Sequence, residues 1–185
     1  MQAVILSERA LPDADGLFAA AVDHIGRKLG RAKPLDVSAL PAGRAETVAA
    51  LDAWAVGDVD WRGELTRYYE DHIPLHLRPS PALNAALRQL GARGVRIGFW
   101  SPGPDEAARI VVHHVGLGRR VEAVRIGGSA EVAERLAADL GAAPADALVV
   151  SANAAELAAA AARGLPTATP DDLVVRAQGE PAVSR

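Results

Sequence analysis

The sequence predicts an α/β protein with a Rossmann-like parallel sheet of about five strands flanked by helices. Short apolar runs of strand length alternate with amphipathic helical patterns, and strands separated by helices pair in parallel through right-handed crossovers. The clearest such runs are residues 3–6, 95–100, 119–126 and 147–150. A second observation concerns residues 12–79, which follow the first run, lack a strong strand signal and therefore predict a helical insert.

The first strand leads directly into three polar residues. Residues 3–6 are uninterruptedly apolar, which is typical of a strand buried on both faces, and Ser7, Glu8 and Arg9 follow them. In an open α/β sheet, ligands bind outside the carboxyl ends of the strands. We therefore expect these three side chains to lie in the functional site.

The insert contains three predicted helices. Apolar residues recur four apart over 16–29, where Asp15 is the expected N-cap, and further helices are predicted at 43–56 and 60–73. Pro74 disfavours continuation of the third helix.

Most of the chain's few aromatic residues fall in this insert: Trp54, Trp61, Tyr68 and Tyr69. We expect them to form a small core of the insert itself, since large side chains stabilise small cores. The alternative is an exposed patch for a partner protein or a second copy of the chain.

Strand and helix signals alternate after the insert. Ser80 followed by Pro81 marks a helix start, and Asn153 begins a later helix with capping-box spacing. Residues 165–169 and 172–175 are expected to supply one last short strand, and residues 177–185 a flexible tail.

Composition restricts the classes of function. Half of the residues are hydrophobic and the net charge is −3, which gives no reason to expect nucleic acid or an anionic membrane as a partner. The chain has no cysteine, so disulfides and zinc–thiolate sites are excluded. We see neither a secretory signal nor a membrane-spanning segment, and expect a cytoplasmic protein.

The layout resembles the haloacid dehalogenase (HAD) superfamily. The spacing of residues 3–9 is similar to that family's first motif, and residues 140–150 and 161–167 are similar to segments around its fourth motif. Residues 78–83 resemble the passage that leads from cap to core in that family. The resemblance implies a core of residues 1–11 and 80–176 and a helical cap of residues 12–79.

The resemblance also implies roles for individual positions. In that family, the first-motif aspartate is the nucleophile, the second aspartate is the acid/base and fourth-motif acids hold magnesium. Here Ser7 stands at the nucleophile position, Arg9 at the acid/base position and Ala152 in the fourth motif, where Glu156 is the best remaining acid. The hydroxyl that binds phosphate survives as Ser101.

These replacements disfavour magnesium. Ser7 and Ala152 remove carboxylates that hold such an ion, and Arg9 adds a permanent positive charge. Two like unit charges about 4 Å apart repel by about 4 kcal/mol at an effective dielectric of about 20, and a divalent ion about doubles this. We therefore expect no catalytic residue at these three positions and no magnesium. Gly127-Gly128 lacks the spacing of a dinucleotide fingerprint, so no other cofactor is expected either.

The leading hypothesis is therefore a pseudophosphatase that acts by binding a protein partner or a small anionic ligand. The anion-binding candidates are Ser7, Arg9, Ser101, Gly103 and Arg125, the last being the cation nearest to the family's lysine position. Alternatively, Arg9 pairs with Glu8, Glu156 or another acid and only fills the altered site.

Two other readings stay open. One is an active phosphatase or hydrolase of that superfamily with a remodelled site, in which Glu8 or Glu156 supplies the carboxylate. Another is an assembly role, with a possible homodimer through the aromatic cap. His72 and His76 are four residues apart, as two helical metal ligands are, but Pro74 between them and the lack of a third ligand disfavour a metal site.

Overall fold

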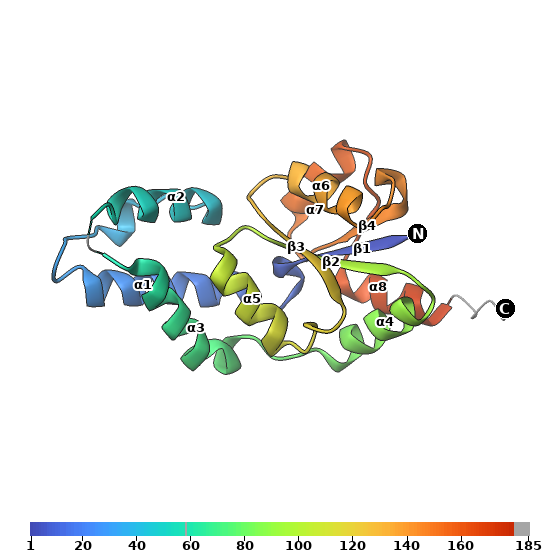
Figure 1. Ribbon diagram of the computed structural model, residues 1–185, viewed down its shortest axis with the longest axis horizontal. Helices are drawn as coiled ribbons and strands as arrows, with labels where there is room; N and C mark the ends of the chain where they lie inside the picture. The colour runs from blue at the N-terminus through green and yellow to red at the C-terminus, as the bar shows by residue number, and fades with distance from the viewer. Residues whose placement is uncertain (58, 180–185) are drawn as a thin grey trace.

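The computed structural model describes residues 1–57 and 59–179. A five-stranded parallel sheet in the order β3-β2-β1-β4-β5 forms its centre (Figure 1). The strands are β1 (Ala3–Ser7), β2 (Arg96–Ser101), β3 (Val121–Ile126), β4 (Ala147–Val150) and β5 (Thr167–Ala168). The predicted fold class is confirmed, and β1 lies in the middle of the sheet, paired with β2 and β4.

Helices follow the strands in the expected alternation. Those of the sheet region are α4 (Pro81–Ala92), α5 (Asp105–His114), α6 (Glu131–Asp139), α7 (Ala154–Ala162) and α8 (Pro170–Gly179). The helices of the insert are α1 (Ala14–Leu29), α2 (Arg44–Trp54) and α3 (Trp61–His76). Short 3-10 turns occupy Glu8–Ala10, Val37–Ala39 and Pro144–Asp146.

The two faces of the sheet carry different helices because neighbouring residues of a strand point to opposite sides. On β1, Val4 and Leu6 pack in one apolar cluster with α4, α5 and α8, whereas Ala3 and Ile5 pack in a second cluster with α6 and α7. Figure 1 shows α6 and α7 above the sheet and α4 and α8 below it. All residues of β1 are buried, as expected for a central strand.

The helical insert lies to one side of the sheet in Figure 1. The prediction that its aromatics form a separate core is wrong. Trp61 and Tyr69 are buried in the same cluster as Val4 and Leu6, and Trp54 and Tyr68 pack against that cluster as half-buried side chains. Helix α3 packs against both α1 and α5, which makes the apolar core continuous from the insert to the sheet.

Two details of the insert differ from the sequence prediction. Asp15 is not the cap of α1, because the helix starts at Ala14 and Asp13 is the N-cap in a left-handed conformation with φ of 58°. Pro74 does not end α3, which continues to His76. A proline removes only one amide hydrogen bond, and the buried Ile73 holds this last turn against the core while its carbonyl accepts from the amide of Leu77.

The C-terminal prediction also needs correction. Residues 172–175 are helical and belong to α8, where Leu173 is buried against the core, so only Thr167–Ala168 of the expected last strand is a strand. Ala177 is buried too, and the helix reaches Gly179, so the expected tail starts too early. The remainder of that tail, residues 180–185, lies outside the described residues.

His72 and His76 each have a hydrogen-bond partner of their own. Nδ1 of His72 lies 3.0 Å from the carbonyl oxygen of Tyr68, and Nδ1 of His76 lies 2.7 Å from a carboxylate oxygen of Asp13. Within residues 1–57 and 59–179, no helix combines the length and the apolar character that crossing a bilayer requires.

Candidate functional site

Three serines end or follow adjacent strands at the carboxyl edge of the sheet. Ser7 ends β1, Ser101 ends β2 and Ser151 follows β4, and all three are fully buried. Each hydroxyl accepts a hydrogen bond from the main-chain amide two residues later, at 3.0 to 3.1 Å. These local turns are typical of serine and fix all three hydroxyls at the strand ends.

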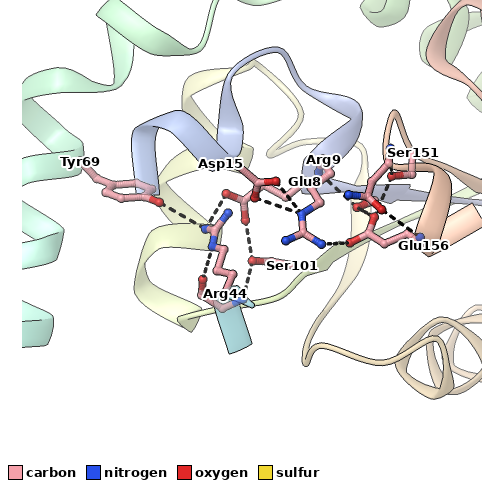
Figure 2. A network of polar contacts seen from close by, with 11 residues as sticks. Glu8, Arg9, Asp15, Arg44, Tyr69, Ser101, Ser151 and Glu156 are labelled. Atoms are coloured by element: carbon pink, nitrogen blue, oxygen red, sulfur yellow. Dashed lines mark hydrogen bonds and ion pairs between the residues drawn. The ribbon is translucent and has the colours of Figure 1, made fainter. Parts of the chain in front are cut away.

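Each of these serines donates its hydroxyl proton to a buried glutamate. Ser7 and Ser151 both donate to Oε2 of Glu156, at 2.7 Å, and Ser101 donates to Oε2 of Glu8, at 2.5 Å. Figure 2 shows the two glutamates on either side of the end of β1. The sheet edge therefore holds two glutamate-centred networks rather than a pair of aspartates.

The first network contains Arg9. Its Nη1 lies 3.1 Å from Oε1 of Glu156, and its Nε lies 2.9 and 3.0 Å from the two carboxylate oxygens of Asp15. Asn153 caps helix α7 by accepting from the amide of Glu156, as the sequence predicted, and so fixes this glutamate in the first helical turn. Arg9 therefore pairs with acids, in agreement with the alternative in which it fills the altered site.

The second network joins the insert to the sheet. Arg44, the first residue of α2, donates from Nη2 to Oε1 of Glu8 at 2.7 Å and from Nε to the carbonyl oxygen of Gly103 at 2.9 Å. The hydroxyl of Tyr69 from α3 lies 3.2 Å from the same Nη2, and the guanidinium lies over the ring of Phe18. Arg44 is only 3% exposed, so α2 is anchored over the ends of β1 and β2.

Burial and charge shift the pKa of Arg44 in opposite directions. Burial alone would lower the pKa of Arg44, but the charge of Glu8 and the hydrogen bond to Glu8 raise it above its usual value. Burial raises the pKa of the Tyr69 phenol, which stays neutral. Arg44 is thus a permanent cation and Tyr69 a neutral phenol.

The structure brings together four of the five predicted anion-binding residues. Ser7, Arg9, Ser101 and Gly103 all lie at the carboxyl edge, but most of their donors already have partners: the amide of Gly103, for example, donates to the hydroxyl oxygen of Ser101. The fifth candidate, Arg125 on β3, instead forms a bidentate ion pair with Asp139 of α6, at 2.6 and 2.9 Å.

Ala152, at the altered fourth motif, takes part only through its main chain. Its amide donates to the carbonyl oxygen of Arg9 at 3.2 Å, which ties the loop after β4 to the loop after β1. A methyl side chain offers no ligand to a metal ion.

The donor set at this edge does not fit magnesium. All four carboxylate oxygens of Glu8 and Glu156 accept hydrogen bonds from arginine or serine, and each glutamate is paired with a guanidinium. Magnesium requires carboxylates whose charge is available to it. In the described part of the chain, no group of three or more His, Cys, Asp or Glu side chains is arranged to hold a metal ion.

Sequence reasoning missed Arg44 and Tyr69. A usable signal existed for Arg44, since an arginine at the first position of a helix faces the positive end of the helix dipole and needs a compensating acid. Nothing in the sequence pattern names Glu8 as that acid. Tyr69 was assigned to an apolar core, and its hydroxyl contact with Arg44 depends on tertiary structure.

A cavity of about 320 Å³ adjoins the second network between α1 and the segment that leads into α2. Phe18, Val22 and Leu40 supply apolar walls, and Arg9 and Arg44 lie at its border. The lining also contains the acids Asp15 and Asp23, and Glu8 and Glu156 pair with the two arginines as well. An added anion would therefore meet no uncompensated positive charge there.

No protein-family model matches the chain, and no curated protein sequence matches it. Solved structures do match. CbbY from Rhodobacter sphaeroides in complex with phosphate is 15% identical, covers 91% of this chain and 85% of its own, and has a TM-score of 0.68. Beta-phosphoglucomutase from Clostridium difficile is 16% identical over 90% and 83% of the two chains, with a TM-score of 0.63.

A HAD family hydrolase from Deinococcus radiodurans R1, with bound phosphate and sodium, is 20% identical over 96% of this chain and 88% of its own, with a TM-score of 0.58. These similarities extend over the sheet and the helical insert alike, since they cover at least nine-tenths of this chain. The chain therefore has the fold of the haloacid dehalogenase superfamily.

Proposed function

We propose that this protein is a pseudophosphatase: it has the HAD fold, does not form an aspartyl-phosphate and acts by binding. The observation that carries the proposal is the state of Ser7, which stands where the family's nucleophile would be. Ser7 is fully buried, and its hydroxyl is bound to Glu156, whose other oxygen is paired with Arg9. A phosphoryl group has no access to this oxygen.

The charges around Ser7 support the same conclusion. Nucleophilic attack on phosphate needs a nucleophile at the surface and positive charge that is free to stabilise the transferred group. Arg9 and Arg44 supply two cations, but Glu156, Asp15 and Glu8 already neutralise them. The networks instead hold the insert against the sheet edge, which suits a binding protein whose shape is fixed.

The first experiment measures hydrolysis of p-nitrophenyl phosphate with magnesium by the purified protein. We expect no turnover above the rate without protein. Turnover that needs magnesium and disappears in Ser7→Ala would overturn the proposal.

The second experiment restores the family's acids. The triple variant Ser7→Asp, Arg9→Asp and Ala152→Asp should gain stabilisation by magnesium in thermal unfolding, because it replaces a cation by carboxylates. Wild-type protein is the control and should show no such stabilisation. Equal stabilisation of both proteins would count against the proposed loss of the metal site.

A second candidate function rests on one contact. The 2.7 Å hydrogen bond from Ser7 to Glu156 has the geometry of a serine next to a general base, which favours a remodelled hydrolase. Its weakness is that Oε2 of Glu156 also accepts from Ser151 and Oε1 from Arg9. In a remodelled hydrolase, Glu156→Gln and Ser7→Ala would abolish the same activity, whereas the pseudophosphatase has none to lose.

The insert offers surface for a protein partner or a second copy of the chain. Leu75 on α3 and Val56 after α2 are 72% and 77% exposed, although Trp61 and Tyr69 are buried and cannot contribute. Sedimentation equilibrium of wild type and Leu75→Ser tests self-association. A mass above the monomer that falls in the variant would support it, and a monomer in both would refute it.

A further inference from the structure

A second hollow lies at the amino edge of the sheet, opposite the network of Ser7 and Glu8. It has a volume of about 320 Å³ and forms where α4 ends and where β2 and β3 begin. Leu87 and Ile97, both at most 2% exposed, are among the apolar residues that line it. This volume is at the lower end of the range of small-molecule sites.

Positive charge is concentrated around this hollow. Its lining includes Arg88 from α4, Arg96 at the start of β2, and Arg119 and Arg120 from the turn before β3. Glu122 is the one acid in that lining, so the formal charge of the lining is +3. The whole chain, by contrast, has a net charge of −3.

Two of these arginines are held in place by the fold. Arg96 donates to Glu122 and to the carbonyl oxygen of Leu140, both at 2.8 Å, and Arg120 donates to the carbonyl oxygen of Gly116 at 2.9 Å. Main-chain anchors of this kind fix the direction of a guanidinium before any ligand arrives.

The other two arginines have side chains without a partner among the described residues. Within residues 1–57 and 59–179, neither the Arg88 nor the Arg119 side chain has a hydrogen bond or an ion pair, although both border the hollow. A guanidinium has donors in a fork that matches the oxygens of a phosphate. Two free guanidiniums beside two anchored ones therefore suit a ligand with more than one oxyanion group.

We propose that this hollow, defined by Arg88, Arg96, Arg119 and Arg120, is a binding site for a small molecule that carries a diphosphate group. In the lining, Glu122 is the one acid that offsets the mutual repulsion of the four arginines. Bound oxyanions would reduce this repulsion further. The site lies at the edge of the sheet opposite Ser7 and Arg9, so it does not depend on the proposed loss of catalysis.

Isothermal titration of the full chain with pyrophosphate at low ionic strength tests this site. We expect saturable binding of one pyrophosphate per chain that weakens as salt rises. Arg88→Gln and Arg119→Gln should each weaken the affinity about tenfold. Both residues are exposed and unpaired, and thermal unfolding checks that the variants remain folded.

Arg109→Gln is the matched control, since Arg109 is also exposed but lies on α5, paired with Asp105. It should keep the wild-type affinity. Titration with a nucleoside diphosphate tests whether the site also recognises an organic part of the ligand. Tighter binding than that of pyrophosphate would indicate that the apolar lining contacts the nucleoside. Equal binding would indicate that the site recognises the diphosphate group alone.

Three results would overturn the proposal. The first is the absence of saturable pyrophosphate binding. The second is an equal loss of affinity in a variant outside the hollow. Such a loss in Arg109→Gln would make the effect one of overall charge, and such a loss in Arg9→Gln would place the anion at the carboxyl edge of the sheet. The third is tighter binding of a single-stranded oligonucleotide than of pyrophosphate, which would indicate an extended polyanion surface.

Discussion

Arg44 of the insert and Glu8 of the loop after β1 form an ion pair of 2.7 Å in which both side chains are buried. The pair joins residues 36 positions apart and fixes α2 over the carboxyl edge of the sheet (Figure 2). One nitrogen of the same guanidinium, Nη1, is buried without a hydrogen-bond partner among the described residues. The pair therefore holds α2 against the loop after β1, while the buried, unpaired Nη1 reduces the stability that the pair contributes.

Removal of the Arg44 charge should destabilise the protein strongly. Arg44→Met leaves the buried carboxylate of Glu8 without its counter-charge, and loss of one partner of a buried pair typically costs about 3–5 kcal/mol. Urea unfolding measures this free energy. The double variant Arg44→Met with Glu8→Gln should be more stable than Arg44→Met, because it no longer buries an unpaired charge.

Arg62→Met is the control for this prediction. Arg62 pairs with Asp52 on the surface, and exposed pairs contribute about 1 kcal/mol or less. A loss in Arg44→Met no larger than that in Arg62→Met would contradict a stabilising role of the buried pair.

Glu64 should make stability depend on acid pH. Burial would raise its pKa, but hydrogen bonds from Lys28, Arg67 and His24 outweigh burial and lower the pKa from 4.5 to about 2. A carboxyl group with a lowered folded-state pKa stabilises the protein fully above its unfolded pKa of 4.5 and loses that contribution as the pH falls towards 2. The lost contribution is about 3 kcal/mol at most.

Unfolding free energies measured between about pH 6 and pH 2 check this dependence. Glu64→Gln should flatten the curve below about pH 5, whereas Glu70→Gln, at an exposed position on the same helix, should not. Parallel curves for wild type and Glu64→Gln would refute the prediction.

Gly98 on β2 should not tolerate a methyl group. A Cβ at this position would lie 2.9 Å from Cγ of Leu136 and 3.0 Å from Cδ1 of Leu140, both on the face of the sheet that α6 covers. Gly98→Ala should therefore cost about 1–3 kcal/mol through overpacking, as measured by thermal or urea unfolding. Gly91→Ala is its counterpart in helix α4, where a Cβ meets no atom within 4 Å, and it should be neutral or stabilising.

Asn153 should stabilise α7 through its cap. Its side-chain oxygen accepts from the amide of Glu156 at 3.0 Å, so Asn153→Ala should cost about 1 kcal/mol. Asn153→Asp keeps an acceptor of the same shape and should retain most of the stability, measured by urea unfolding. If both variants lose the same stability, the cap is not the cause.

The sequence by itself determined the fold class and most element positions. Period-two and period-3.6 apolar patterns report which side of an element is buried, and the caps at Ser80 and Asn153 are bonds within a few residues. Such local relations are present in the sequence, which is why β4 was predicted at its observed bounds and the helical insert was found between the first two strands.

Only the tertiary structure decided which charges meet. Ser7 and Glu156 are 149 positions apart and Glu8 and Ser101 are 93 apart, and neither pairing follows from a periodic pattern. Asp15 looked like a helix cap but binds Arg9, and Arg44 had no assigned role. The physical reason is the range of each relation. The apolar pattern that indicates the buried face of a helix or strand is formed by residues close together in the chain. The energy of an ion pair instead depends on distance in space, which is fixed only when the insert packs against the sheet.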